Sequence, residues 1–326
     1  MPSSLQNEVD LPFIDMSQFQ LEFEELNLLQ HHPAVATVRE ACQKWGFFRV
    51  LNAGIPIHLQ NVERVIHELC GMPPAVKDRA IASSPADGYY RTLTLENFCF
   101  LNLPHSDSVQ ALSRQIWPET GNPNFRSETI GTYTFAMADL QRKMSKIILA
   151  SLGLDVKTFY HSDFEECTAY MRINHLWSDG KFMEEEEVLP PHTDIACFTI
   201  LYQDDEGGLQ IRSDEGKWLN VKPVSNSFIV NVADSLKAWS NGRYRSAEHR
   251  VVHKGWRDRI SVPWFAQFPY DKEIWAPAEL VDDEIHPRRY RPFTFSQFRR
   301  DFLLNLFSKQ ENPVTFVESY AGISRG

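Results

Sequence analysis

Apolar residues near the start of the chain follow the pattern of one helix between two strands. The apolar positions within 35–45 fall on one helical face, and Gly46 then predicts the end of that helix. The run at 47–51 predicts a strand, and the shorter apolar run at 11–15 predicts another. The pattern therefore opens with strand, helix and strand.

Two further helices are predicted in this half of the chain. Apolar residues within 62–69 form a stripe that Pro73 brings to an end, and those within 133–151 form a longer stripe that stops at Gly153. Between them, residues 83–125 have little periodicity and many Gly, Pro, Ser and Asn residues, which predicts loops and short turns. Apolar side chains would anchor these loops, namely Phe98, Phe100, Trp117 and Pro118.

From residue 169 the pattern changes to short apolar runs separated by turn residues. Strands are expected over 170–173, 198–203, 209–212, 218–222, 228–232, 248–252 and 260–268. Gly207-Gly208 and Asn241-Gly242 are typical of the turns between such strands. Many short strands at this interval predict a sandwich or a jelly roll. Apolar residues at helical spacing within 295–303 predict a helix near the C-terminus.

Three residues in the β-rich half could bind one metal ion. Side chains two residues apart on a strand leave the same face, so His192 and Asp194 can bring an imidazole and a carboxylate to one point. His249 follows in the alternating stretch 243–251, which predicts another strand. Two histidines and one carboxylate with open positions are the ligand set of non-haem Fe(II) sites.

A second signal is needed, because a His-x-Asp tripeptide arises easily by chance in a chain with eleven histidines. Arg259 and Ser261 supply it, since they place a guanidinium and a hydroxyl on one face of a strand. Arg offers a planar pair of donors that suits a carboxylate. The pair therefore predicts a dicarboxylate co-substrate, held at one end by the metal and at the other by Arg259.

These residues belong to a longer series of motifs. The series comprises His192-Thr193-Asp194, 198–204, Gly207-Gly208-Leu209-Gln210, Trp239-Ser240-Asn241-Gly242, His249-Arg250-Val251 and Arg259-x-Ser261-x-x-x-Phe265, with 45–52 in the N-terminal half. In order and spacing it resembles the plant-type 2-oxoglutarate- and Fe(II)-dependent dioxygenases, and is most similar to gibberellin oxidases and their relatives. The resemblance covers most of the chain.

The resemblance implies a mainly β protein with flanking helices, built on a double-stranded β-helix, a jelly roll of the cupin kind. It implies one catalytic unit over 1–326. Within this unit we expect an N-terminal mixed helical region at 1–165, a β-helix core with the Fe and 2-oxoglutarate sites at 166–275, and a C-terminal helical segment at 276–326.

The resemblance also implies the cofactors and the reaction. Fe(II) and 2-oxoglutarate would act with O2, with ascorbate as a candidate reductant. Decarboxylation of 2-oxoglutarate would be coupled to hydroxylation or desaturation of a small organic molecule. The implied metal ligands are His192, Asp194 and His249, and the implied 2-oxoglutarate contacts are Arg259, Ser261 and Asn174.

The chain departs from the family pattern at a few positions. Many relatives have Asn-x-Tyr ahead of the ligand strand, and the Tyr helps to bind 2-oxoglutarate; this chain keeps Asn174 but has Leu176 in place of that Tyr. Ala53 stands where relatives have His, and Ala233 stands where they have Gly before the aspartate at 234. None of these changes removes a metal ligand, so we expect an active enzyme.

The substrate pocket is less defined by the sequence. In relatives, the region that here spans 83–125 helps to cover the pocket, so Tyr89, Tyr90 and Phe100 are candidate contacts, with packing beneath a long loop as an equal alternative. His175 would be a pocket or core residue. Phe265 shares a strand face with Arg259 and should line the pocket, unless it packs as a structural residue between the layers.

The expected substrate is a small, largely apolar molecule, such as a gibberellin-like hormone or another plant specialised metabolite. A carboxylated hormone or a terpenoid fits best, and a phenolic or alkaloid substrate stays open. Two other functions also stay open. A zinc-dependent hydrolase could use the same His-Asp-His set but leaves Arg259 and Ser261 unexplained. A non-catalytic binding protein on the same fold would not need the complete ligand set.

Composition narrows the partners and the compartment. The formal charge of −10, from 33 Lys and Arg against 43 Asp and Glu, argues against nucleic acid and against anionic membranes. Five cysteines without a Cys-x-x-Cys pair favour a reducing compartment. Residues 1–10 do not resemble a signal peptide, and no apolar run reaches the roughly 20 residues of a membrane helix. We expect a cytoplasmic, monomeric enzyme.

Overall fold

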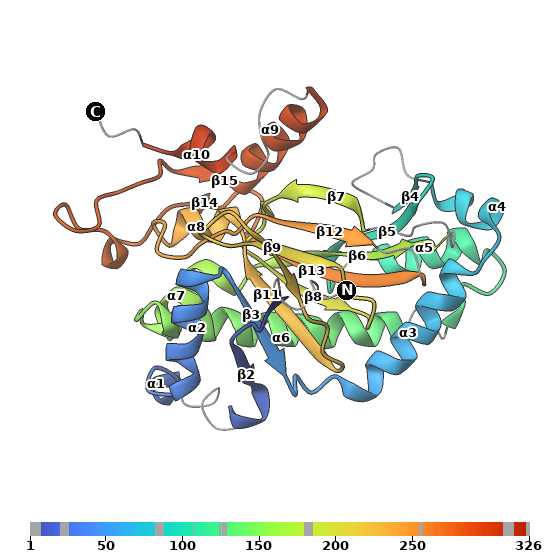
Figure 1. The fold of residues 1–326 in the computed structure, drawn as a ribbon, viewed down its shortest axis with the longest axis horizontal. Coiled ribbons are helices and arrows are strands. Elements are labelled where there is room, and N and C mark those ends of the chain that lie inside the picture. Colours follow the sequence, from blue (N-terminus) through green and yellow to red (C-terminus); the bar gives the residue numbers. More distant parts are fainter. Residues whose placement is uncertain are drawn as a thin grey trace, which may run out of the picture.

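Two β-sheets form the centre of the molecule (Figure 1). This computed structural model describes residues 8–19, 26–81, 88–105, 107–123, 125, 129–178, 185–253, 257–308 and 316–323. The strands are β1 (Glu8–Val9), β2 (Phe13–Asp15), β3 (Phe47–Leu51), β4 (Gly88–Arg91), β5 (Leu95–Leu103), β6 (Thr168–Leu176), β7 (Glu186–His192), β8 (Phe198–Gln203), β9 (Leu209–Arg212), β10 (Trp218–Val221), β11 (Ser227–Val232), β12 (His249–His253), β13 (Arg259–Gln267), β14 (Glu273–Ile274) and β15 (Phe293–Thr294). The larger sheet has the order β2-β3-β11-β8-β13-β6-β5-β4, and the smaller has the order β1-β10-β9-β12-β7.

Helices pack around the two sheets (Figure 1). They are α1 (Leu26–Leu29), α2 (Pro33–Lys44), α3 (Pro56–Cys70), α4 (Pro74–Lys77), α5 (Ser108–Ile116), α6 (Ile130–Ser151), α7 (Val156–Phe159), α8 (Asp234–Trp239), α9 (Phe295–Ser308) and α10 (Phe316–Ala321). The long α6 runs along the sheet (Figure 1), and Trp264 of β13 donates its indole N–H to Gln141 of α6 at 2.7 Å. The predicted helices at 35–45, 62–69 and 133–151 are therefore confirmed as α2, α3 and α6.

Strand alternation gives the larger sheet two different faces. On β13, the side chains of Ile260, Val262 and Trp264 are buried in the core that includes the helices. The alternate residues of the same strand, from Arg259 to Phe265, face a cavity between the two sheets. This pair of sheets, with an internal cavity and helices on one outer face, confirms the predicted jelly-roll core.

The loop prediction for 83–125 is wrong. Residues 88–91 and 95–103 form the hairpin β4-β5, which extends the larger sheet by pairing β5 with β6, and residues 108–116 form the helix α5. Most of β5 is buried, so the strand has no alternation of apolar and polar residues to mark it. The helical spacing of Val109, Leu112 and Ile116 does mark α5, and all three are buried.

The strand predicted over 243–251 begins only at His249. Residues before it pack against the corner between α2 and β3, where the backbone N–H of Arg245 donates to the carbonyl of Cys42 at 3.0 Å. Gly46 permits this contact, because a Cβ on it would lie 2.3 Å from the Arg245 carbonyl oxygen. The segment before His249 thus packs against the end of α2 and does not belong to a sheet.

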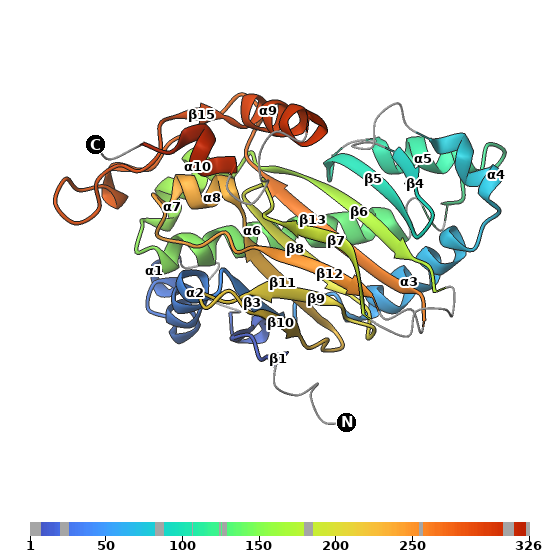
Figure 2. The same ribbon diagram turned by 45° about the horizontal axis from the view of Figure 1, so that its top comes forward.

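The C-terminal elements α9, α10 and β15 lie together beside the open side of the sheets (Figure 2). The predicted C-terminal helix is α9. Among the described helices, none is long and apolar enough to cross a membrane. Residues 1–7, part of the stretch interpreted as unlike a signal peptide, lie outside the described residues.

Candidate active site

The three predicted metal ligands meet at one end of the cavity. The ligand atoms of His192, Asp194 and His249 all lie within 4.8 Å of one another. His192 and His249 are register partners on β7 and β12, and their ring centroids are 4.3 Å apart. The smaller sheet therefore places both imidazoles side by side.

Both imidazoles point their Nε2 atoms towards the carboxylate of Asp194. The Nδ1 atoms of His192 and His249 lie 2.8 Å and 3.1 Å from the backbone carbonyls of Pro190 and Ala247, so each Nδ1–H donates to a carbonyl. Nε2 of His192 is 3.9 Å and Nε2 of His249 is 3.8 Å from Asp194 oxygens. Burial and the neighbouring His249 lower the pKa of His192 to about 4, although Asp194 opposes this. His192 is thus neutral, with an Nε2 lone pair available to a metal.

Asp194 is not on the strand, contrary to the prediction. β7 ends at His192, and the carboxylate comes from the segment that follows. The carbonyl of Asp194 accepts from the backbone N–H of Asp234 at 2.8 Å, which fixes this segment against α8. One carboxylate oxygen accepts from Thr199 at 2.6 Å and from Asn231 at 2.9 Å, so the other remains for a metal. Burial would raise the pKa of Asp194, but both histidines and these two hydrogen bonds hold it below its usual value.

Arg259 lies at the other end of the cavity, with a side chain that is 3% exposed. Its guanidinium donates to Ser261 Oγ at 3.0 Å, to Gln203 Oε1 at 3.2 Å and to the carbonyl of Gly207. Burial lowers the pKa of Arg259 to about 10, with Asp204 opposing, so the group stays charged at neutral pH. The residue therefore presents a fixed positive charge.

The cavity between these two ends has a volume of about 370 Å³. Strand alternation brings Asn174 and Leu176 of β6 to its wall, and Leu176 is the register partner of Arg259. Phe265 also lines it and stacks on Tyr170, with ring centroids 4.4 Å apart and planes 13° apart. The geometry expected for Phe265 is therefore present.

Four predicted pocket residues are not among the described residues that line this cavity. His175 lies between Asn174 and Leu176, so alternation turns it to the opposite face of β6. Phe100 and Tyr89 lie on that same outer face, where they are 0% and 1% exposed. Tyr90 lies on the edge strand β4 and is 38% exposed. The region is structured as a sheet edge, so for Tyr89, Phe100 and His175 the geometry favours the packing alternative.

Two arginines of the cavity were missed by the sequence interpretation. Arg172 lines the cavity two residues before Asn174, so strand alternation could have identified it. Arg299 lines it from α9, together with Phe302, Leu303 and Leu306. No local pattern could have identified Arg299, because the orientation of α9 over the cavity depends on tertiary packing.

Comparisons with known proteins agree with this geometry. Residues 167–268 match the 2OG-Fe(II) oxygenase superfamily, and residues 11–119 match the N-terminal region of non-haem dioxygenases in morphine synthesis. A gibberellin 20-oxidase-like protein of Arabidopsis thaliana is 33% identical over 89% of this chain and 94% of its own length. The 2-oxoglutarate-dependent dioxygenase DAO of Oryza sativa is 32% identical over 81% of this chain and 87% of its own.

Solved structures give the same result. The structure of the dioxygenase for auxin oxidation in rice has a TM-score of 0.79 at 28% identity and covers 96% of this chain and 100% of its own. The structure of JOX2 in complex with 2OG, Fe and JA has a TM-score of 0.78 at 29% identity and covers 98% and 92%. With two histidines, one carboxylate and a buried arginine brought together on this fold, the chain belongs to the 2OG-Fe(II) oxygenase superfamily.

Proposed function

We propose that His192, Asp194 and His249 bind the Fe(II) of this enzyme. The donor set fits, because two imidazole nitrogens and one carboxylate oxygen converge within 4.8 Å and accept no hydrogen bond from the described residues. Membership of the oxygenase superfamily favours this reading over the zinc hydrolase and the non-catalytic binding protein that the sequence left open.

At the other end of the cavity, Arg259 and Ser261 bind the distal carboxylate of 2-oxoglutarate, and Asn174 contacts the same co-substrate. The fit rests on charge: no carboxylate of the described residues lies within ion-pair distance of Arg259, although its guanidinium is buried. Gln203 adds a buried Nε2 that has no hydrogen-bond partner in the described part of the chain. A bound carboxylate would satisfy these donors.

When bound, Fe(II) and 2-oxoglutarate supply the oxidising chemistry with O2, as 2-oxoglutarate becomes succinate and carbon dioxide and the substrate is hydroxylated or desaturated. The chain's own residues orient the reactants. His192 and His249 are held by their Nδ1–H bonds to backbone carbonyls, and Asp194 is held by Thr199 and Asn231. Apolar side chains of the cavity exclude water from the reacting groups.

The prime substrate is a small, largely apolar molecule that carries a carboxylate. Arg172 and Arg299 carry this inference, because neither has an ion pair in the described part of the chain and the Nε of Arg172 is buried without a partner. Burial raises the pKa of Tyr170, and both Arg172 and Arg299 oppose that rise, so both guanidiniums lie near the same hydroxyl. Two cations beside one point favour an anionic group there.

The charges of the loaded site strengthen this proposal. Fe(II), Asp194, doubly charged 2-oxoglutarate and Arg259 cancel one another once all are present. Arg172 and Arg299 then remain as uncompensated positive charge in a partly buried, mainly apolar cavity. A monocarboxylate with an apolar skeleton, such as the hormone-like acids that the sequence favoured, would pair with the arginines at one end and place its skeleton against Phe265 and Leu303.

The test is turnover of a panel of small apolar carboxylic acids, each beside its methyl ester. We expect succinate and an oxidised product from acids and about ten- to a hundredfold lower kcat/KM for the esters, since a charge-assisted hydrogen bond contributes about 1.5–3 kcal/mol. Arg172→Gln and Arg299→Gln should reduce kcat/KM for the acid by a similar factor and remove the preference for acid over ester.

Arg300→Gln is the matched control, because Arg300 neighbours Arg299 on α9 but has a 67% exposed side chain paired with Asp301. It should leave the acid preference unchanged. Equal turnover of acids and esters by the unaltered enzyme would refute the carboxylate subsite.

We also propose that the protein is a cytoplasmic monomer. The negative net charge supports the absence of nucleic-acid and membrane partners. All five cysteines are free thiols, as expected in a reducing compartment. Light scattering and cell fractionation test these two points.

A further inference from the structure

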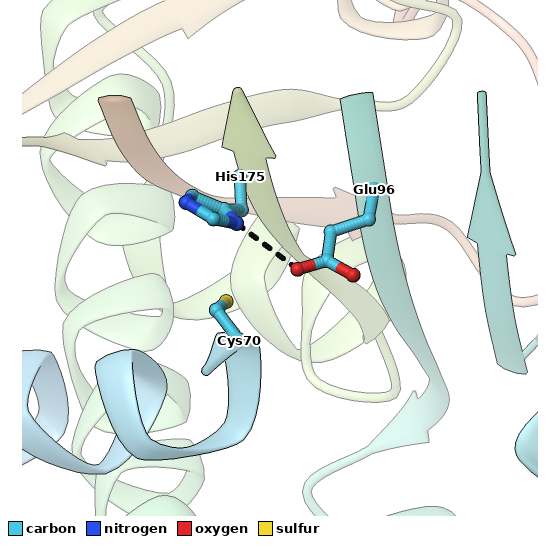
Figure 3. A group of neighbouring side chains, drawn as sticks. All are labelled: Cys70, Glu96 and His175. Atoms are coloured by element: carbon cyan, nitrogen blue, oxygen red, sulfur yellow. Dashed lines mark hydrogen bonds and ion pairs between the residues drawn. The ribbon is translucent and has the colours of Figure 1, made fainter. Parts of the chain in front are cut away.

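A buried polar cluster lies behind the cavity, on the outer face of the larger sheet. Figure 3 shows its centre, where His175 of β6 points towards Glu96 of β5, above Cys70 at the end of α3. His175 Nδ1 is 3.0 Å from Glu96 Oε1, and His175 Nε2 is 3.0 Å from Asp258 Oδ2. The His175 side chain is 5% exposed, Glu96 is fully buried, and Asp258 is 46% exposed.

Cys70, Glu96 and His175 are close enough to suggest a metal site, but their partners argue against one. Lys77 Nζ lies 2.6 Å from Glu96 Oε2 and donates to the Cys70 carbonyl at 2.7 Å, so an ammonium already lies beside the carboxylate. Burial, with Glu96 nearby, raises the pKa of the Cys70 thiol, whereas a metal needs a thiolate. The cluster is therefore a hydrogen-bond network.

The geometry gives each ring nitrogen of His175 a carboxylate acceptor at 3.0 Å. Burial would raise the pKa of Glu96, but hydrogen bonds from His175, Lys77 and Tyr89 hold it below its usual value, so Glu96 is ionised and needs an N–H on Nδ1. The other nitrogen faces the carboxylate of Asp258, which also accepts from the backbone N–H of Ser178 at 2.7 Å. A neutral imidazole has one N–H and would turn a lone pair towards one of the two carboxylates.

The network lies on the opposite face of the larger sheet from the cavity, directly behind Arg259. Two residues of the network, His175 and Asp258, are adjacent in sequence to residues that line the cavity. Asn174 and Leu176 flank His175, and Arg259 follows Asp258. Arg259 pairs with Leu176 across the sheet, and Ile260 pairs with His175. The contact between His175 and Asp258 therefore lies directly behind the proposed 2-oxoglutarate anchor.

We propose that His175, as an imidazolium between Glu96 and Asp258, is a positioning residue that fixes the start of β13 and thereby the guanidinium of Arg259 for 2-oxoglutarate. The charges support this arrangement, because Lys77 and His175 balance Glu96 and Asp258 in a region where an unpaired charge would be costly. Asp258 is the last residue before β13, so its ion pair holds the strand where Arg259 leaves it. The proposal rests on the proposed role of Arg259.

The first test is equilibrium binding of 2-oxoglutarate to the Mn(II)-loaded protein by calorimetry, which needs neither turnover nor the prime substrate. Asp258→Ala removes the half-exposed partner and leaves the buried pair of Lys77 and Glu96 intact. We expect the Kd for 2-oxoglutarate to rise about five- to twentyfold, because hydrogen bonds between charged groups are among the stronger ones. Mn(II) affinity should not change.

Asp155→Ala is the matched control, since Asp155 also accepts from a backbone N–H, that of Thr158 at 2.8 Å, but caps α7 and does not line the cavity. It should lower thermal stability without changing the Kd. Arg259→Ala separates the two proposals. If it weakens binding while Asp258→Ala does not, the positioning role is wrong and the co-substrate anchor stands; if Arg259→Ala has no effect, the anchor itself is wrong.

The second test observes the protonation of His175 in the unaltered protein. Nitrogen-15 NMR of histidine-labelled protein at neutral pH should give two protonated ring nitrogens for His175, assigned by their loss in His175→Gln. A neutral His175 tautomer would overturn the proposal, whatever the binding data.

Discussion

Arg259 differs from the other two arginines of the cavity in how firmly the protein holds it. Its guanidinium donates to Ser261, Gln203 and the carbonyl of Gly207, so its orientation exists before any ligand binds. Arg172 and Arg299 have no such partners in the described part of the chain. The proposed co-substrate thus binds an arginine that is already oriented, Arg259. The proposed substrate binds Arg172 and Arg299, whose orientations it helps to fix.

Phe265 lines the cavity and, through Tyr170, lies near one of the two arginines proposed to bind the substrate. Its ring stacks on Tyr170, whose ring lies 5.9 Å from the guanidinium carbon of Arg172. Phe265→Ala should therefore raise the KM for the acid substrate by about tenfold or more and release succinate without matching product, while 2-oxoglutarate affinity is kept. Steady-state kinetics with succinate and product measured together would show this.

Phe135→Ala, at a 56% exposed position on α6, is the control for loss of a phenyl ring. If Phe265→Ala only unfolds at a lower temperature and couples normally, Phe265 is a structural residue.

At the scale of elements, local patterns predicted helices with a buried stripe and strands that are continuous apolar runs between turns. α2 and α6 each have a buried stripe, and β8, β9 and β13 lie between clear turns. β5 escaped prediction because Glu96 and Asn97 interrupt its apolar run, although both residues are buried. His192, His249 and Arg259 were recognisable from their spacing, whereas Arg299 was not, because its place in the site depends on how α9 docks.

The turn between β8 and β9 brings the backbone of Gly208 close to Arg259. Gly208 has φ of +89°, and a Cβ there would lie 2.2 Å from the Val252 carbonyl oxygen and 3.5 Å from Arg259 Nε. Gly208→Ala should lower stability by about 1–3 kcal/mol and also weaken 2-oxoglutarate binding, because the clash displaces the strand beside Arg259. Thermal unfolding and 2-oxoglutarate titration measure the two effects.

Gly216→Ala separates backbone strain from the clash. Gly216 has φ of +78°, but a Cβ there would meet only the Arg212 side chain, at 3.8 Å. The Gly216→Ala variant should be less stable than the unaltered protein and should bind 2-oxoglutarate with normal affinity. Equal affinity in both variants would contradict the contact between this turn and the site.

At the scale of the whole molecule, the proposed ligands come from both sheets. His192 and His249 belong to the smaller sheet, and Arg259 and Ser261 belong to the larger one. Metal and 2-oxoglutarate should therefore both raise the free energy of unfolding. Each ligand at a hundred times its Kd should add about 2.7 kcal/mol. Calorimetric unfolding with Mn(II) and 2-oxoglutarate, alone and combined, measures the gain.

His249→Ala should lose the gain from Mn(II). His161→Ala, which removes an 82% exposed histidine paired with Glu165, should keep it. Retention of the Mn(II) effect in His249→Ala would mean that the metal binds elsewhere.

One wall of the cavity belongs to a helix outside both sheets. Arg299, Phe302 and Leu303 of α9 face the substrate region, whereas the proposed iron ligands and Arg259 belong to the sheets and the turns that join them. Part of the proposed substrate site thus lies in a stretch of the chain separate from the proposed iron and 2-oxoglutarate residues, while Arg172 and Phe265 contribute from the larger sheet. A chimera that exchanges only this helix should therefore change the substrate range while it keeps the proposed iron and 2-oxoglutarate residues.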